Sequence, residues 1–405
     1  MWRHKCSLAI GILLVLFIMM TVSVTRIPQG ITISESIKRP ASIFKQTDVG
    51  PGTTITRPGQ VLIPELIADE AALNVTGHMS PRLENATFFS LVRNSELDQM
   101  LSSIREVQDR FNIRFGYDWV FANDKPFTEE FMTTVRSYFT SGTPQFVTIP
   151  REYWSYPDWV DKDRAAESRR DAENQRVMYG GSESYRHMCR FNSGFFFYLL
   201  SSYRYYWRVE PGIKFSCDII DDPFRLMREG SKKYVSAMIM PEGENAVKGL
   251  WTVVRQHFPA DFFTSQVDHN NLASFITDDG GLTYNLCHFW SNFEIADLDL
   301  FRGEQYQEYF NALDATGNFF YERWGDAPVH SIYVALVLQP SEIMFLDTVG
   351  YYHKPNHACP RDETARKVNR CLCDPNEDWN WHTWNSCGKN YFKMQGHQLP
   401  PGIVW

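Results

Sequence analysis

The sequence lacks three features that would each indicate a broad class of protein. It has no excess of basic residues, because its formal net charge is −8, and this argues against a nucleic-acid partner, which calls for a basic face. It shows no internal repeat with a period of roughly 20–50 residues, the signature of solenoids and propellers. Beyond residue 24 it has no second long apolar run, so any membrane topology is limited to a single crossing.

The long apolar run that is present lies near the N-terminus, at Ser7–Val24, after the basic segment Trp2–Lys5. It is uncharged and close to the lower length limit for a helix that crosses a hydrocarbon core of about 30 Å. The cations before it favour a cytoplasmic N-terminus. A cleaved secretory signal is the alternative, but its apolar region is usually shorter and ends at small residues, so a retained anchor is favoured. Both interpretations place the rest of the chain in the secretory lumen, and glycosylation sequons at Asn74 and Asn85 agree with this.

Cysteine is scarce, with eight residues, and its use fits an oxidising compartment. Cys6 precedes the apolar run, which leaves an odd number of cysteines on the lumenal side, so at least one is free or pairs with another chain. Near the C-terminus, Cys371, Cys373, His382 and Cys387 resemble a zinc site only superficially, because C-x-C spacing is unusual for structural zinc. A disulfide staple of the C-terminal segment is the favoured interpretation, with a pairing that the sequence does not reveal.

The composition divides the chain into segments of different character. A stretch rich in Thr, Ser, Pro and Gly follows the apolar run and is typical of a linker that holds a globular domain away from a membrane. The expected segments are a cytoplasmic tail at residues 1–6, a transmembrane signal anchor at 7–24, a lumenal stem at 25–83, and a globular domain, the seat of any catalytic function, at 84–405.

The globular domain begins with alternating strand and helix patterns. Short apolar runs at Thr87–Val92, Tyr117–Ala122 and Gln145–Ile149 predict strands. Apolar residues at helical spacing across Leu97–Phe111 predict a helix between the first two strands, and a second helix is expected from Thr128. This order indicates an α/β domain with parallel strands.

Further along the chain, YYWRV at Tyr205–Val209 predicts a buried strand. Helices are expected across Asn245–Phe258, Gly303–Ala315 and Pro328–Leu338. In open α/β sheets, ligands bind at the carboxyl ends of the strands, and Arg93 and Asp124 follow the first two predicted strands, which places them at such ends.

The most informative stretch is YNLCHFWSNFE at Tyr284–Glu294, which surrounds one carboxylate with aromatic residues. Such neighbours solvate charge poorly, so Glu294 needs a metal, a cationic transition state or a hydrogen-bond network as its partner. Aromatic walls beside an acid also suit the flat C–H faces of sugar rings. The stretch therefore indicates a sugar site with Glu294 at its centre.

Three segments are candidates for a metal site. Glu210 closes an apolar strand and precedes proline, so it either binds a metal–diphosphate group or caps the strand and faces water. His353 lies among tyrosines and is a buried hydrogen-bonding residue unless Glu210 lies opposite it, in which case the two suit Mn²⁺, with Mg²⁺ as the alternative. Asp297-Leu298-Asp299 resembles the D-x-D of many sugar transferases, but these aspartates also fit a solvent-facing role, and Glu210 is preferred.

Other candidates are single side chains with an ordinary alternative role. Asp326, before Ala327-Pro328, either caps a helix or contacts an acceptor hydroxyl. Arg93 and Arg190 are candidates for binding a diphosphate, because guanidinium binds phosphate at two points, although surface arginines are commoner. Tyr185 lies close to Arg190 in the same aromatic segment.

Several long segments together resemble one family. YRHMCRFNSGFFFY, YYWRVEPGIKFSCDI, YNLCHFWSNFEIADLDLFR, GNFFYERWGDAPVHSI and YYHKPNHACP look like signature segments of the fungal Golgi α-1,2-mannosyltransferases of the KTR type, glycosyltransferase family 15. The resemblance implies a GT-A-like fold with a mixed central sheet, GDP-mannose as donor and Mn²⁺ as cofactor. It further implies retention of the anomeric configuration and a mannose-bearing acceptor on N- or O-linked glycans of cell-wall glycoproteins.

The resemblance also implies roles for individual residues. Glu210 in VEPG and His353 in YYHKP would bind the metal, and Glu294 in NFEI would be the nucleophile or the carboxylate that stabilises the cation. Tyr185 in SYRHMCRF would lie at the reaction centre, and Asp326 in WGDAP would be the acid on the acceptor side.

Arg93 and Asp124 would, by the same resemblance, lie in the nucleotide pocket. The chain also departs from the family pattern: Gly212 stands where many members carry Asp or Asn, Asn192 where Tyr is usual, and Leu199–Ser202 replaces a longer loop. These departures concern the acceptor choice and the rate, because they lie near the expected metal and acceptor region.

Two other functions remain as alternatives. A non-catalytic lumenal module could bind mannan chains through its aromatic residues without metal or nucleotide. A glycoside hydrolase could use Glu294 and Asp326 as its pair of carboxylates and cleave mannosides without a nucleotide.

Overall fold

The computed structural model describes residues 83–264, 270–383 and 386–396. The expected tail, anchor and stem, together with Asn74, lie outside these residues, so the predicted segment boundaries stay predictions. Contacts divide the chain into Met1–Leu73 and Asn74–Trp405, and the described residues all belong to the second unit. Within the described ranges, no helix has the length and apolar character needed to cross a membrane.

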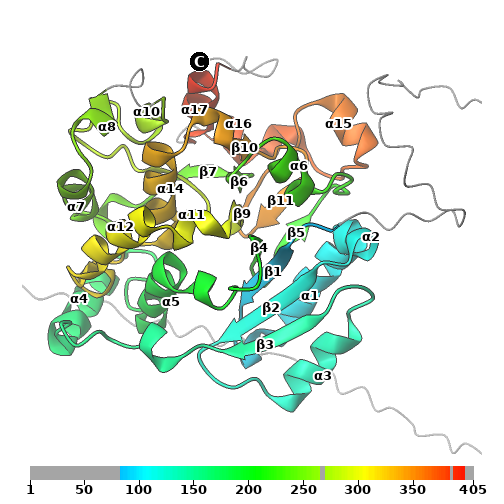
Figure 1. Cartoon of the computed structure of the whole chain (residues 1–405), viewed down its shortest axis with the longest axis horizontal. Helices are drawn as coiled ribbons and strands as arrows, with labels where there is room; N and C mark the ends of the chain where they lie inside the picture. Colours follow the sequence, from blue (N-terminus) through cyan, green and yellow to red (C-terminus); the bar gives the residue numbers. More distant parts are fainter. Residues whose placement is uncertain (1–82, 265–269, 384–385, 397–405) are drawn as a thin grey trace, which may run out of the picture. The chain divides into compact units, whose positions relative to one another are not determined.

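A seven-stranded mixed sheet runs through the centre of the described unit (Figure 1), in the order β10-β6-β9-β4-β1-β2-β3. The four strands β4, β1, β2 and β3 are parallel, whereas β9 is antiparallel to both of its neighbours. The expected α/β architecture with a mixed sheet is thus confirmed. The strands are β1 Ala86–Leu91, β2 Asp118–Asn123, β3 Pro144–Thr148, β4 Tyr205–Val209, β6 Tyr234–Ser236, β9 Phe293–Asp297 and β10 Ile343–Phe345.

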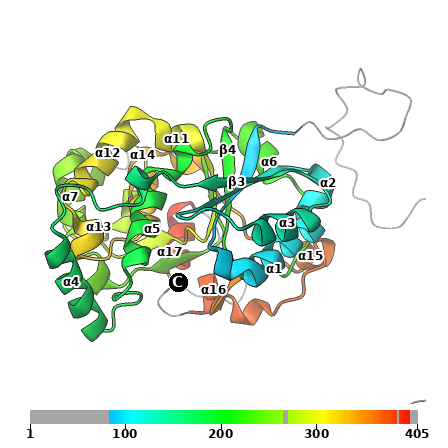
Figure 2. The same cartoon turned by 90° about the horizontal axis from the view of Figure 1, so that it is seen from below.

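The central strands are apolar on both faces because helices cover both faces. On β1, Phe88 points to one core, where it contacts Trp119 and Trp207, and Phe89 points to the other. Figures 1 and 2 show α1 and α3 on one side of the sheet and α5, α12 and α14 on the other. The run TFFSLV was therefore readable as a strand, since burial on both faces produces a continuous apolar run rather than an alternating one.

The helices are short and numerous. The expected helix at Asn245–Phe258 begins later, at Leu250, because Glu322 accepts hydrogen bonds from the backbone N–H of Gly249 and fixes the start of α7 there. The helices are α1 Leu97–Val107, α2 Ile113–Phe115, α3 Glu129–Ser137, α4 Lys162–Asn174, α5 Glu183–Gly194, α6 Pro223–Glu229, α7 Leu250–His257, α8 Asp261–Thr264, α10 Ala273–Ile276, α11 Leu298–Arg302, α12 Glu304–Asp314, α13 Asn318–Tyr321, α14 Asp326–Val337, α15 Glu363–Val368, α16 Trp379–His382 and α17 Gly388–Met394.

Two small sheets complete the fold. A three-stranded antiparallel sheet has the order β12-β11-β5, and a two-stranded one pairs β7 with β8. Because β5 follows β4 closely in the chain, its pairing with β11 brings the segment around residue 353 towards the end of β4. Their bounds are β5 Lys214–Phe215, β7 Ile239–Pro241, β8 Cys287–Phe289, β11 Tyr351–His353 and β12 Asn356–His357.

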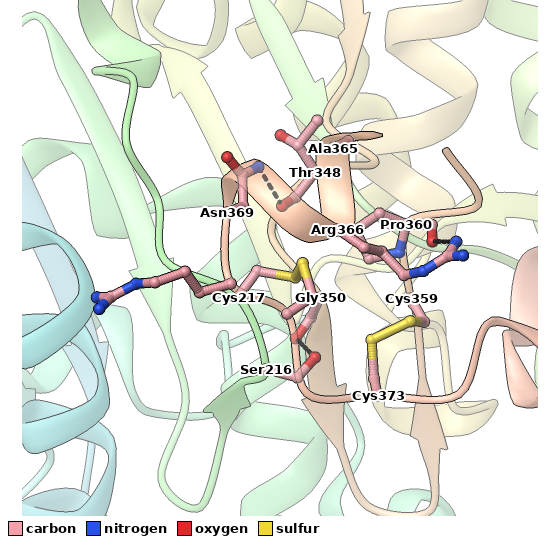
Figure 3. Close-up of a disulfide and its surroundings, with 12 residues drawn as sticks. Ser216, Cys217, Thr348, Gly350, Cys359, Pro360, Ala365, Arg366, Asn369 and Cys373 are labelled. Carbon is pink, nitrogen blue, oxygen red and sulfur yellow. Dashed lines mark hydrogen bonds between the residues drawn. A yellow bond between two sulfur atoms is a disulfide. The ribbon is translucent and has the colours of Figure 1, made fainter. Parts of the chain in front are cut away.

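Two disulfides tie the C-terminal segment to the rest of the domain and a third lies within it, which confirms the expected staple. Figure 3 shows this region, where Ser216 donates a hydrogen bond to the carbonyl of Gly350 and the amide of Asn369 donates one to the carbonyl of Thr348. Among the described residues Cys189 is free and buried, which agrees with the odd number of cysteines that follow the apolar run. The pairs are Cys217–Cys371, Cys287–Cys387 and Cys359–Cys373.

Candidate active site

The carboxyl ends of the parallel strands carry several of the predicted residues. Arg93 follows β1, Asp124 follows β2 and Glu210 follows β4. Asp124 is half-buried. The half-exposed guanidinium of Arg93 donates a hydrogen bond to the hydroxyl of Ser184, the residue before Tyr185 on α5. This end of the sheet and the N-terminus of α5 therefore form one region.

Arg208 links two of the predicted acids. Its Nε lies 2.5 Å from Oε1 of Glu210, and its Nη1 lies 2.5 Å from Oδ2 of Asp326. Ser291 donates a further hydrogen bond of 2.7 Å to Asp326. Arg208 and Asp326 are both buried. Burial alone would raise the pKa of Asp326, but the charge of Arg208, followed by His330 and the bond from Ser291, holds that pKa below its ordinary value.

Arg208 was not predicted as a site residue, although the sequence contains an indication of its importance. Arg208 is the one charged residue of YYWRV, a strand that is buried along its whole length. A charge inside such a strand needs a partner, because an unpaired buried charge is costly. Asp326 correspondingly makes no side-chain cap on α14 and uses its carboxylate on Arg208 and Ser291 instead.

We expect Arg208→Leu to lower the free energy of unfolding by about 3–5 kcal/mol, because it leaves the buried carboxylate of Asp326 without its counter-charge. A matched control is Arg204→Leu, which removes a guanidinium that is 55% exposed and paired with Asp297. That change should cost less than about 1 kcal/mol. Urea denaturation of both variants measures the difference, and equal losses would contradict the structural role assigned to Arg208.

His353 and Glu210 lie on segments that pair with each other. In the antiparallel register of β5 and β11, Tyr352 lies opposite Lys214, so the next step along β11 brings His353 towards the loop that begins at Glu210. Burial raises the pKa of Tyr351 on β11, and the charge of Glu210 raises it further.

The surroundings of His353 and Glu210 are compatible with a divalent metal. Nδ1 of His353 is buried and has no hydrogen-bond partner, and the ring contacts Trp290 at 5.4 Å between centroids. An imidazole nitrogen and a partly exposed carboxylate are donors of the kinds that Mn²⁺ accepts. Within the described ranges, no group of three or more His, Cys, Asp or Glu side chains is placed to hold a metal ion. The role of His353 and Glu210 as ligands stays a prediction.

Glu294 lies on β9. Of the three partners expected for this carboxylate, a metal, a cationic transition state or a hydrogen-bond network, the structure shows the hydrogen-bond network. Its side chain is fully buried and accepts hydrogen bonds from the hydroxyls of Tyr206 and Tyr234. Both carboxylate oxygens lie 3.0–3.1 Å from Nδ1 of His330. Burial alone would raise the pKa of Glu294, but His330, Tyr206 and Tyr234 together hold it below its ordinary value.

The geometry fixes one proton in this network. Nε2 of His330 lies 3.1 Å from the backbone carbonyl of Asn192, which can only accept, so Nε2 carries a hydrogen. Nδ1 then faces Glu294, and an ionised carboxylate is also only an acceptor. A proton must therefore lie between Nδ1 and Glu294. His330 was missed from the sequence because it lies within a helix whose residues are nearly all buried.

Glu294 is enclosed in this structure. Beside it is a cavity too narrow for a water molecule, lined by Phe89, Asn192, Phe196, Tyr206, Arg208, Glu294 and His330. The amide nitrogen of Asn192 has no hydrogen-bond partner there. Asn192 therefore places a small amide beside Glu294. The role of Glu294 in catalysis stays a prediction.

Tyr185, predicted to lie at the reaction centre beside the donor, is near the N-terminus of α5. It is in the first turn of α5, where Ser182 caps the helix by accepting from its backbone N–H. Burial raises the pKa of Tyr185, and among the nearby groups Asp326 raises it while Arg323 lowers it. The phenol thus lies within electrostatic range of Asp326.

Other predicted residues are engaged elsewhere. Arg190 is buried and forms a two-point ion pair with Asp314 at 2.7 and 2.8 Å, so the structure joins it to the end of α12 rather than to the strand ends. Asp297 caps α11 and pairs with Arg204, which supports the preference for Glu210 over the D-x-D-like pair. Asn85 is exposed immediately before β1, as a glycosylation site requires.

The fold and this site together define the class of the protein. The mixed sheet has parallel strands that end at Arg93, Asp124 and Glu210, next to the N-terminus of α5. This is the arrangement of a GT-A-like glycosyltransferase domain. The family described as glycolipid 2-alpha-mannosyltransferase, glycosyltransferase family 15, matches residues 64–396, and the chain belongs to this family. The resemblance found in the sequence is therefore confirmed.

Curated relatives and solved structures agree with this placement. The chain is 49% identical over 330 residues to alpha-1,2 mannosyltransferase KTR1 of Saccharomyces cerevisiae, which covers 81% of this chain and 82% of the relative. It is 48% identical over 319 residues to glycolipid 2-alpha-mannosyltransferase 1 of Candida albicans, covering 78% and 73%. The structure resembles core-mannan synthase A (CmsA/Ktr4) of Aspergillus fumigatus in its Mn/GDP form, with a TM-score of 0.71, 37% identity and coverage of 78% and 87%. It also resembles Ktr4p of S. cerevisiae in complex with GDP, with a TM-score of 0.70, 32% identity and coverage of 78% and 82%.

Proposed function

We propose that this protein is a retaining α-1,2-mannosyltransferase that moves mannose from GDP-mannose to a mannose-bearing acceptor in N- or O-linked glycans of glycoproteins. One observation carries the proposal in a chain of this family: Arg208 joins Glu210, the expected metal ligand, to Asp326, the expected acid on the acceptor side. A donor diphosphate and an acceptor hydroxyl would then meet on either side of one guanidinium.

The residues divide the work according to their charge. Arg93, at the end of β1, would bind the donor phosphates, and Asp124, at the end of β2, would contact the nucleoside. Glu294 would supply the negative charge that stabilises the positive charge developing at the anomeric carbon, in a site that excludes water. Retention is open to a covalent glycosyl intermediate on Glu294 or to attack from the same face.

Glu210 and His353 would hold Mn²⁺, for which Mg²⁺ is the alternative ion. When bound, the ion neutralises the charge of the departing diphosphate. The pairing of Arg208 with Glu210 would keep that carboxylate oriented towards the donor, and Asp326 would accept a hydrogen bond from the acceptor hydroxyl. The relative from A. fumigatus, whose structure is the Mn/GDP form, supports this choice of cofactor.

Titration of GDP into the protein with and without Mn²⁺ tests the proposal against the alternatives. We expect tight GDP binding that weakens at least about tenfold when EDTA removes the metal, because the ion links two protein ligands to the phosphates. A mannan-binding module or a mannoside hydrolase would ignore both nucleotide and metal. The match to GDP-bound relatives disfavours these two alternatives.

We further propose a Golgi location, with the apolar run at 7–24 as a single-pass type II anchor, the stem at 25–83 and the catalytic domain at 84–405 in the lumen. The three disulfides and the exposed Asn85 support a lumenal domain, since disulfides form in oxidising compartments.

A further inference from the structure

The loop between α4 and α5 holds an exposed tyrosine in an unusual backbone conformation. Tyr179 is 59% exposed and has a φ of +57°, in the left-handed region that bulky residues rarely adopt. The next residue is Gly180, so the left-handed conformation is adopted by the tyrosine although a glycine, which adopts it without strain, is its neighbour. A tyrosine at this position adds little to the core, and such backbone outliers concentrate at functional sites.

A buried arginine holds this loop in place. Arg186 is fully buried, and its Nη1 donates hydrogen bonds to the carbonyls of Gly180 at 2.6 Å and Ser182 at 3.1 Å. Its Nε donates to two backbone carbonyls at the end of α13. Gly180 also lies so close to α4 that a Cβ added there would meet the carbonyl carbon of Ala172 at 2.7 Å. The loop therefore presents Tyr179 at a fixed position.

Tyr179 is the outermost ring of a row that leads to the candidate active site. Its ring stacks on Tyr185 with 4.5 Å between centroids and 14° between planes. The guanidinium of Arg323 lies 5.5 Å from the ring of Tyr185, and Arg323 is held by an ion pair with Glu242 at 2.7 Å. The negative charge of Asp326 contributes to the raised pKa of the Tyr185 phenol.

We propose that Tyr179 is a stacking platform for a hexose ring of the mannoside acceptor, an inference that rests on the function proposed above. An aromatic ring offers a large, rigid contact surface, and a pyranose presents flat C–H faces to it. The neighbouring Met178 is also exposed and uncharged, so this surface suits a neutral sugar better than a charged nucleotide. Because Tyr179 stacks on Tyr185, which is expected at the reaction centre, the platform takes the ring next to the reacting mannose.

This position predicts a difference between acceptors of different length. With the full chain in detergent and saturating GDP-mannose, Tyr179→Ala is expected to raise the KM for a mannobiose about five- to tenfold. The KM for methyl α-mannoside, the KM for GDP-mannose and kcat should change less than about twofold. Tyr179→Phe should behave like the wild type, because the ring rather than the hydroxyl makes the contact.

Two controls separate the platform from effects on folding. Tyr138→Ala removes another exposed tyrosine, 42% exposed at the end of α3, and should change no kinetic constant. Tyr179→Gly suits a positive φ, so it should raise the KM for mannobiose as alanine does while the Tm stays equal or rises.

Several outcomes would overturn the proposal. Equal changes for both acceptors, a raised KM for GDP-mannose, or a phenylalanine variant as poor as alanine would each do so. Binding of mannobiose without GDP-mannose, measured by saturation-transfer NMR, keeps this test separate from that of the proposed function. If the wild type bound mannobiose through Tyr179 but transferred nothing, the platform would stand and the transferase function would fall.

Discussion

Glu294→Gln is expected to reduce mannosyl transfer about a thousandfold or more while GDP binding stays near its wild-type value. The substitution keeps the shape of the side chain and one oxygen, which can still accept from one of the two hydroxyls that donate to different carboxylate oxygens, those of Tyr206 and Tyr234. It removes the negative charge that would stabilise the cationic transition state, and a loss of roughly 4 kcal/mol in that stabilisation corresponds to three powers of ten. Turnover on saturating donor and acceptor, with GDP titration alongside, measures both quantities.

A matched control separates charge from network geometry. Tyr234→Phe deletes one hydrogen bond of 2.7 Å to the same carboxylate and leaves its charge. Its loss in kcat should stay between about 10-fold and about 150-fold, well short of a thousandfold, since one hydrogen bond to a charged group contributes about 1.5–3 kcal/mol. If Glu294→Gln turned over like the wild type, Glu294 would have no part in the chemistry.

Glu210→Gln is expected to abolish the response of GDP affinity to Mn²⁺, because an amide oxygen cannot supply the charge of a carboxylate ligand. His353→Ala should do the same, since it removes the second proposed donor. The apparent affinity for Mn²⁺ should fall at least about a hundredfold in each variant. Even residues that only hydrogen-bond to metal ligands typically lower metal affinity about 10- to 100-fold when they are mutated. Titration of Mn²⁺ in the presence of GDP measures it.

Asp299→Asn is the control for the competing metal site. Asp299 belongs to the D-x-D-like pair, and its side chain is 71% exposed with only a loose contact to Arg302. Its loss should leave the Mn²⁺ response unchanged. A variant series in which Asp299→Asn lost the metal response and Glu210→Gln kept it would move the metal from the end of β4 to the end of β9.

The sequence was sufficient to predict the first strands of the sheet and to place three candidate residues at the carboxyl ends of its parallel strands. Runs such as Thr87–Val92 are apolar on both faces, and the residues that follow buried parallel strands must lie at one edge of the sheet. Arg93, Asp124 and Glu210 were therefore placed by local pattern alone. The start of α7 could not be predicted in this way, because it is fixed by the carboxylate of Glu322, which is 73 residues away in the sequence.

The pairings across the chain were out of reach for the same reason. The partner of Arg190 lies 124 residues away and that of Arg208 lies 118 residues away, so local pattern could not tell a guanidinium that binds substrate from one that binds an aspartate. The disulfide between Cys217 and Cys371 closes a separation of 154 residues, and backbone hydrogen bonds from Leu372 to Ser216 and from Asp218 to Asn369 bring the two segments together, which spacing does not reveal. His330 could not be identified from the sequence, because it lies in a nearly completely buried helix, where local pattern does not show which polar residue has a functional partner.

The most direct test of the account is the identity of the product. Incubating the full chain with GDP-mannose, Mn²⁺ and methyl α-mannoside should yield a disaccharide whose NMR spectrum shows an α-1,2 linkage, and none should form when EDTA replaces the metal. A β-linked product, a different linkage position, or equal yield without metal would contradict the assignment of donor, cofactor and stereochemistry.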